Sequence, residues 1–197
     1  MSSRINRFLA LATSVLLVLV GISAIDSKNE ATAADASRFD PGLIISDSVF
    51  YDFGTMTVAD IQRFLESKVP VCKANDGGPT CLRDYVTDEL EKVGEDGKCQ
   101  SMPAKQNVKA SQVIYDIARA CGINPRVLLV VLQKEQGLVQ ATNPTAYMYR
   151  AALGYGCPDS DPGICGKVWS GLFNQLYKGA GQLQWYNDLR GSFTSMK

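Results

Sequence analysis

The chain of 197 residues contains no histidine. This absence excludes catalysis by a Ser-His or Cys-His pair and every zinc site that needs an imidazole ligand. The 20 basic and 20 acidic residues balance one another, so the net charge does not favour a nucleic acid as partner. The sequence also lacks a C-x-x-C pair. We therefore expect no metal site and no cofactor.

The N-terminus has the pattern of a secretory signal. Two arginines precede an uncharged run over residues 8–25, and small residues follow. We expect cleavage after Ala33, which fits the A-x-A pattern, with cleavage after Ala24 as the alternative. The run of 18 residues is shorter than the roughly 20 that a spanning helix needs. An uncleaved anchor in the membrane through residues 8–25 is the other interpretation.

Removal of residues 1–33 leaves 164 residues with a net charge of −1. That length is enough for one domain with a hydrophobic core. We expect this part to be secreted, as an extracellular or cell wall-associated protein.

Six cysteines follow the signal: Cys72, Cys81, Cys99, Cys121, Cys157 and Cys165. An even number of cysteines in an exported chain indicates disulfides rather than a metal site. Although six cysteines allow 15 pairings, turn-rich loops separate Cys72 from Cys81 and Cys157 from Cys165, which makes these two pairs look local. Cys99 would then pair with Cys121.

The region before residue 107 shows one clear helix. Thr57 and Asp60 predict a capping box at the start of a helix that ends near Lys68. Residues 69–106 have no regular periodicity, except for a short helix expected over about 85–93. We interpret this segment as an irregular lobe held by disulfides.

Apolar residues recur at helical spacing from Lys109 to Gly122, which is suited to end a helix. Asn124 and Pro125 then start another helix, as N-cap and first-turn proline. This second helix runs to about Gln136 and is apolar on all sides. We therefore expect it to be the central, buried helix.

Two more helices are predicted, one from about residue 145 to about residue 153 and one over 167–189 that breaks near Gly179 and Gly181. The fold class is therefore mainly α. The expected organisation is a signal peptide or anchor at 1–33, a disulfide-containing N-terminal lobe at 39–106 and a helical core at 107–197.

Glu135 is the acidic residue at the exit of the most hydrophobic helix. A carboxyl group in such a place is suited to be the general acid that cleaves a glycosidic bond. The alternative is that residues 134–136 are only the solvated polar end of a core helix.

Residues 123–137, Ile-Asn-Pro-Arg-Val-Leu-Leu-Val-Val-Leu-Gln-Lys-Glu-Gln-Gly, resemble the catalytic helix of soluble lytic transglycosylases and goose-type lysozymes. Gln136 stands where those enzymes usually have Ser, and their Gly-Leu-Met-Gln element is missing. The stretch 39–186 also resembles secreted haemagglutinin-like proteins of Gram-positive bacteria, chiefly in residues 39–47, 132–136 and 153–159. The first resemblance implies a lysozyme-like fold for the helical core.

This resemblance implies that Glu135 is the general acid and base. It also implies that Tyr186, within Trp-Tyr-Asn, orients the carboxyl; a place in the core is the alternative for Tyr186. A lytic transglycosylase needs no second carboxylate, whereas a hydrolase does. Asp159 and Asp161 are the nearest candidates in the sequence, although turn formation also explains them.

The implied substrate is the glycan strand of peptidoglycan or another cell-wall polysaccharide. Tyr155, in a glycine-rich loop, is the best candidate to stack on a sugar, while Gln133 and Gln140 are candidates for polar substrate contacts. Other aromatic residues with this potential are Tyr147, Tyr149, Trp169 and Trp185. The rival hypothesis is a non-catalytic cell-wall binding or adhesion module.

Overall fold

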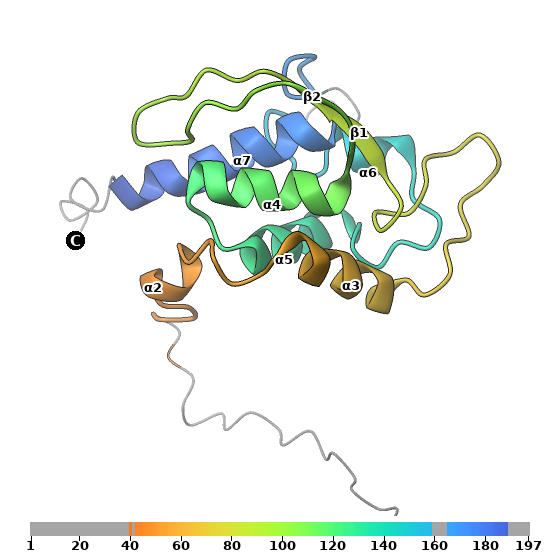
Figure 1. Cartoon of the computed structure of the whole chain (residues 1–197), viewed down its shortest axis with the longest axis horizontal. Helices are drawn as coiled ribbons and strands as arrows, with labels where there is room; N and C mark the ends of the chain where they lie inside the picture. Colours follow the sequence, from red (N-terminus) through yellow and green to blue (C-terminus); the bar gives the residue numbers. More distant parts are fainter. Residues whose placement is uncertain (1–39, 41, 159–164, 189–197) are drawn as a thin grey trace, which may run out of the picture. The chain divides into compact units, whose positions relative to one another are not determined.

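Eight regular elements make up the described part of the chain (Figure 1), which in this computed structural model comprises residues 40, 42–158 and 165–188. They are α2 (Asp47–Phe50), α3 (Val58–Lys68), β1 (Val86–Glu89), β2 (Lys105–Lys109), α4 (Ala110–Cys121), α5 (Pro125–Gln136), α6 (Ala146–Arg150) and α7 (Leu172–Asp188). The predicted signal or anchor and the candidates Asp159 and Asp161 lie outside the described residues. Within those residues, no helix has the length and apolar character needed to cross a bilayer.

Local capping signals account for the ends of three helices, as predicted. The side chain of Thr57 accepts a hydrogen bond from the backbone amide of Asp60, and the Asp60 carboxylate accepts one from the backbone amide of Thr57, so α3 begins with a capping box. Gly122 ends α4 in the left-handed conformation, with φ 65°. Asn124 caps α5 by accepting a hydrogen bond from the Arg126 amide, and Pro125 occupies the first turn.

The central helix is α4 rather than α5. It contacts α3, α5, α7 and both strands (Figure 1), and its residues Ile114 and Ile117 are fully buried. In α5, Leu128 and Leu132 are buried, but Val130 on the opposite side is 64% exposed. The prediction of a helix buried on all sides is therefore wrong. A helix with apolar residues on every side is buried only where other elements pack against it, and no element of the described part covers Val130.

Strands β1 and β2 form an antiparallel pair, with Val86 opposite Lys109 and Glu89 opposite Lys105. The predicted helix over 85–93 is wrong, and so is the prediction of a mainly α, lysozyme-like fold. The architecture is mixed α/β, with helices packed beside a two-stranded sheet. The residues that pair with β1 lie 16 to 23 positions further along the chain, and local periodicity carries no signal for such a pairing.

The three disulfides are those predicted: Cys72–Cys81, Cys99–Cys121 and Cys157–Cys165. Cys99–Cys121 joins the chain between the two strands to the end of α4, where the Gln100 amide also donates to the Ala120 carbonyl at 2.7 Å. Three disulfides and no free cysteine among the described residues fit a chain that folds in an oxidising compartment.

Helix α7 continues through Gly179 and Gly181, so the predicted break is wrong. Both glycines allow close packing: a Cβ at Gly179 would overlap the Leu153 side chain, and one at Gly181 would lie 3.1 Å from Cys99 Sγ. Tertiary contact, rather than a break in the helix, explains these two residues.

Candidate functional site

Glu135 lies in the last turn of α5, which ends at Gly137 in the left-handed conformation. Its side chain is 35% exposed, and Oε1 lies 3.1 Å from the Nζ atom of Lys134. The other oxygen, Oε2, faces the chain after α6, because a Cβ added at Gly154 would lie 4.0 Å from it. The carboxyl group is therefore held between solvent and a second segment.

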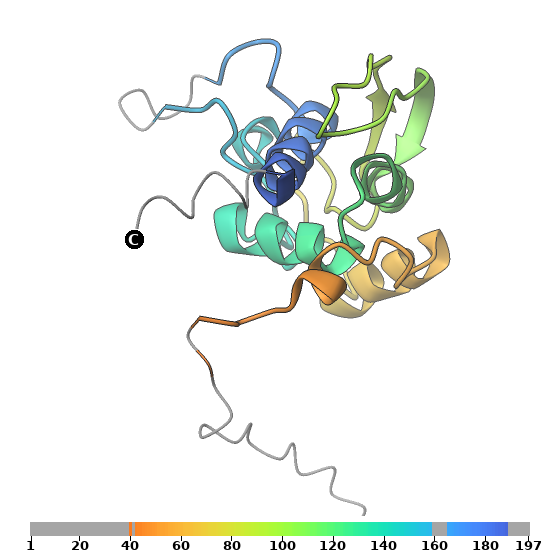
Figure 2. The same ribbon diagram turned by 90° about the vertical axis from the view of Figure 1, so that its left-hand side faces the viewer.

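A pocket of about 200 Å³ is lined in part by Gly154, the residue that Glu135 Oε2 faces, although Glu135 itself is not among the lining residues. Its walls come from α5, from the segment after α6 and from α7, and the residues are Val131, Leu153, Gly154, Tyr155, Gly179, Gln182 and Leu183. Val131 and Glu135 are four residues apart and so lie on one face of α5. Glu135 thus extends the α5 wall of the pocket, and Figure 2 shows α5 beside α7 on this side of the protein.

Gln175, which is fully buried, holds the wall between residues 153 and 155. Its Oε1 atom accepts hydrogen bonds from the amides of Leu153 and Tyr155, at 3.1 and 3.0 Å. Its Nε2 atom donates to the carbonyls of Tyr155 and Trp169, at 2.7 and 2.8 Å. These four bonds use the whole capacity of the side-chain amide. Sequence reasoning missed this residue because a buried Gln and a solvated one look alike in a helical pattern.

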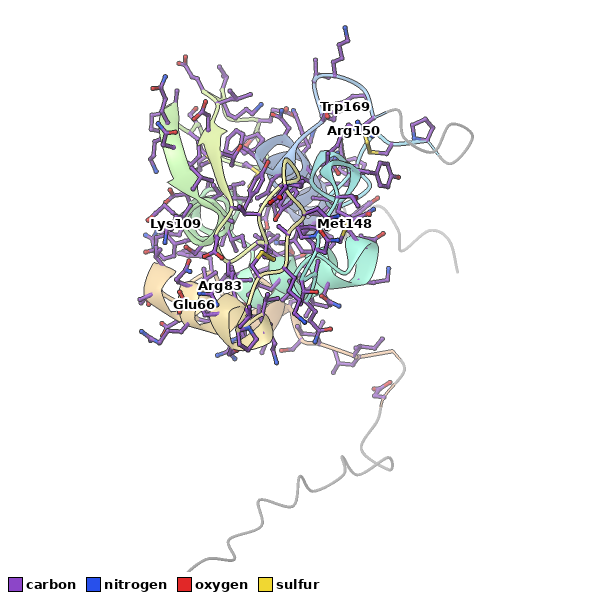
Figure 3. All side chains as sticks on the ribbon, turned by 90° about the vertical axis from the view of Figure 1, so that its right-hand side faces the viewer. Glu66, Arg83, Lys109, Met148, Arg150 and Trp169 are labelled. Atoms are coloured by element: carbon purple, nitrogen blue, oxygen red, sulfur yellow. A yellow bond between two sulfur atoms is a disulfide. The ribbon has the colours of Figure 1, made fainter. Side chains whose placement is uncertain are left out.

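The aromatic candidates take different positions. Tyr155 lines the pocket and meets the Trp169 ring edge-on, with centroids 6.0 Å apart. Trp169, labelled in Figure 3, also packs closely on Gly156. Tyr149 is buried and stacks on Tyr85 at 3.8 Å, so its ring is not available to a ligand. Tyr147 lies near Arg150, and Trp185 beside its neighbour Tyr186.

Tyr186 is 49% exposed and therefore does not occupy the core. It follows Gln182 by four residues and Gly179 by seven, so it continues the face of α7 that forms the pocket wall. In the described part of the protein, no hydrogen bond joins Tyr186 to Glu135. Glu135 thus continues the α5 wall and Tyr186 the α7 wall, and neither residue is among those that line the pocket itself.

Gln133 and Gln140 do not share the pocket of Glu135. Gln133 Nε2 donates to Gln140 Oε1 at 3.1 Å, and the Gln140 amide donates to Gln133 Oε1 at 3.1 Å. Both residues line a separate groove between α3 and α5. Gln133 and Glu135 are two residues apart, which corresponds to about 200° of rotation around the helix axis. Their side chains therefore point to different sides of α5. The role of Gln133 and Gln140 in substrate binding remains a prediction.

Glu95 was not identified from the sequence. It lies in a small recess that shares Tyr155 and Gln182 with the pocket of Glu135. Lys178 and Lys98 donate hydrogen bonds to its carboxylate, at 2.7 and 2.6 Å. These two bonds lower the pKa of Glu95 to about 2, so it carries a negative charge at neutral pH. No residue type or spacing in the sequence indicates this triad.

A comparison with known protein families matches residues 43–184 to the LasA N-terminal domain. No curated protein and no solved structure matches the chain. The match includes every residue that lines the pocket of Glu135, whereas Tyr186 lies just beyond it. The resemblance to lytic transglycosylases, goose-type lysozymes and haemagglutinin-like proteins is not confirmed by these comparisons. The family and the three disulfides fit a secreted protein.

Proposed function

The chain belongs to the family of the LasA N-terminal domain, and we propose that it is a secreted cell-wall protein that cleaves glycosidic bonds in peptidoglycan. The observation that carries this proposal is the position of Glu135. Its carboxyl group stands at the edge of a pocket of about 200 Å³ that has an aromatic side chain, Tyr155, and an amide, Gln182, in its walls. Aromatic faces and amides are groups that suit contact with sugars.

Glu135 acts first as acid and then as base. The protonated carboxyl donates its proton to the glycosidic oxygen while the bond from that oxygen to the anomeric carbon breaks. The carboxylate then takes a proton from the hydroxyl that attacks the anomeric carbon. If this hydroxyl belongs to the same sugar, an anhydro ring closes; if it belongs to water, the bond is hydrolysed.

The walls of the pocket favour the first of these routes. Within the described residues, no carboxylate lines the pocket itself, and ring closure needs none beyond that of Glu135. For hydrolysis, the ionised Glu95 beyond Tyr155 is a candidate for positioning water, beside Asp159 and Asp161. In this proposal Tyr186, one turn beyond Gln182 on α7, orients the carboxyl group of Glu135 once a glycan fills the pocket.

The test is to incubate the exported, purified protein with cell-wall sacculi and to measure released muropeptides by liquid chromatography and mass spectrometry. We expect Glu135→Gln to lower the release by about 10²-fold or more, the usual worth of a general acid. Glu91→Gln, which changes an exposed carboxylate elsewhere, should leave release unchanged. The mass of the product distinguishes an anhydro sugar from a hydrolysed one.

Two results would contradict the proposal in different ways. Equal release by wild type and Glu135→Gln would remove Glu135 from the mechanism. Binding to sacculi without release by the wild type would favour the rival hypothesis, a non-catalytic cell-wall module that uses the same pocket.

A further inference from the structure

A second and larger groove, of about 490 Å³, lies between α3 and α5. Its apolar wall is formed by Met56, Phe64, Leu129, Val130 and Val139. Leu129 and Val139 belong to the buried core, but Val130 is 64% exposed. A large apolar side chain in the middle of a helix, exposed beside an apolar groove, indicates a binding surface more often than a lone surface valine does.

Among the described residues, the charged groups in the wall of this groove are two cations, Lys68 and Arg126. Neither has an acidic partner among the residues that the structure describes. Lys68 Nζ lies 5.1 Å from the centroid of the Phe64 ring, and Arg126 stands in the first turn of α5, where the helix dipole adds positive potential. The groove is thus apolar along its floor and positive in its charge.

The two side-chain amides in the groove wall already have hydrogen-bond partners in the protein. Gln133 and Gln140, the two amides in the wall, bond to one another. Among the described residues, this leaves the two cations as the polar groups of the wall without an acidic partner. A ligand for the groove therefore has an apolar body and an anionic head.

The size of the groove favours a small ligand over a protein. A volume of about 490 Å³ falls within the roughly 300–1,000 Å³ typical of small-molecule sites. A stable protein interface needs about 800 Å² and 20 to 30 residues on each side, whereas nine residues line this groove. We propose that the groove binds a long-chain fatty acid, with its acyl chain against Phe64 and Val130 and its carboxylate on one of the two cations of the wall, Arg126 or Lys68.

This site is separate from that of Glu135. Arg126, Val130 and Gln133 follow one another at helical spacing on one side of α5. Arg126 and Glu135 are nine residues apart, which places them about 180° from each other around the helix axis. The fatty-acid site therefore does not depend on the proposed cleavage of glycans.

The test is isothermal titration of the purified protein with sodium oleate below its micelle concentration. We expect one oleate per chain, and an affinity at least about tenfold weaker in the double variant Lys68→Gln/Arg126→Gln, which removes both cations of the groove wall. The double variant Lys109→Gln/Lys167→Gln removes two exposed charges elsewhere and should bind as the wild type does. Val130→Asp should abolish binding, and methyl oleate, with the same chain but no charge, should bind at least about tenfold more weakly than oleate.

Several results would overturn the proposal. Equal affinity of the wild type and the Lys68→Gln/Arg126→Gln variant would remove the carboxylate contact. Equal affinity for oleate and methyl oleate would leave only non-specific apolar binding. No saturable binding of oleate, with binding to anionic phospholipid vesicles instead, would point to a membrane surface. In a variant such as Glu135→Gln, oleate binding should be unchanged.

Discussion

At the scale of single residues, the packing of Trp169 on Gly156 gives a sharp prediction. Gly156 has φ 65°, and a Cβ added there would overlap the Trp169 ring. Gly156→Ala should therefore cost about 1–2 kcal/mol for the left-handed backbone and a further 1–3 kcal/mol or so for overpacking. Chemical denaturation in urea measures the loss of unfolding free energy.

A matched control separates the two costs. Gly137 has nearly the same φ, 63°, but a Cβ there would meet nothing within 4 Å. Gly137→Ala should therefore lose only the backbone part. Equal losses in the two variants would mean that the Trp169 ring moves away freely and that the close packing has no energetic consequence.

Residues whose role depends on neighbours in sequence were predictable, and residues whose role depends on neighbours in space were not. Thr57 with Asp60, and Asn124 with Pro125, act on their own helix ends, so their spacing suffices. Gln175 looks like any polar residue of a helix, yet it makes four hydrogen bonds to backbone groups 6 to 22 residues away. Likewise, the position of Glu135 at a pocket follows from contacts across three segments rather than from its own helix.

At the scale of the elements, the sheet was missed for a similar reason. Strand β1 has the burial pattern of a half-exposed segment, and only its last residue, Glu89, is buried. A strand with one buried acidic residue gives no apolar alternation for a prediction to use. The disulfides, in contrast, were confirmed, because turn-rich loops and the requirement to pair all six cysteines limit the choices.

The disulfide Cys99–Cys121 should stabilise the arrangement of these elements more than Cys72–Cys81 does. It closes the longer loop, with a separation of 22 residues rather than 9, and loop closure of this size is worth about 3 kcal/mol. It also fastens the segment between β1 and β2 to the end of α4. We expect Cys99→Ala/Cys121→Ala to lower the urea midpoint more than Cys72→Ala/Cys81→Ala. A larger loss in the second pair would contradict this ranking.

At the scale of the whole molecule, two carboxylates give the folded state opposite responses to pH. Glu89, the buried last residue of β1, has a pKa raised from 4.5, first by burial and then by the nearby charge of Asp116 in α4, while Lys105 opposes both. Glu95 has a pKa lowered to about 2 by its hydrogen bonds to Lys178 and Lys98. Each shift makes stability depend on pH, with the sign set by which state binds the proton more tightly.

The opposite pKa shifts of Glu89 and Glu95 predict two separate declines in stability, one on each side of about pH 4.5. Because the folded state holds the proton of Glu89 more tightly than the unfolded chain does, the stability linked to this proton is present below about pH 4.5 and is lost as the pH rises through the folded-state pKa. The stability linked to Glu95 is present above about pH 4.5 and is lost as the pH falls towards 2. In urea titrations across this range, Glu89→Gln should remove the decline on the alkaline side, since its amide never ionises. Glu95→Gln should remove the decline on the acid side and leave the other in place.

The Glu89 prediction also tests how the sheet is joined to the helices. Lys105 Nζ lies 3.2 Å from Glu89 and also pairs with Asp116 of α4, so a single ammonium group compensates two carboxylates at the junction of β1, β2 and α4. If the ammonium group of Lys105 fully offset the burial of Glu89 and the charge of Asp116, Glu89 would titrate like a solvated carboxyl group. Glu89→Gln would then keep the pH profile of the wild type. A flatter profile above about pH 4.5 in this variant would instead show that burial outweighs the ion pair. The junction would then be stronger with a proton on Glu89 than without one.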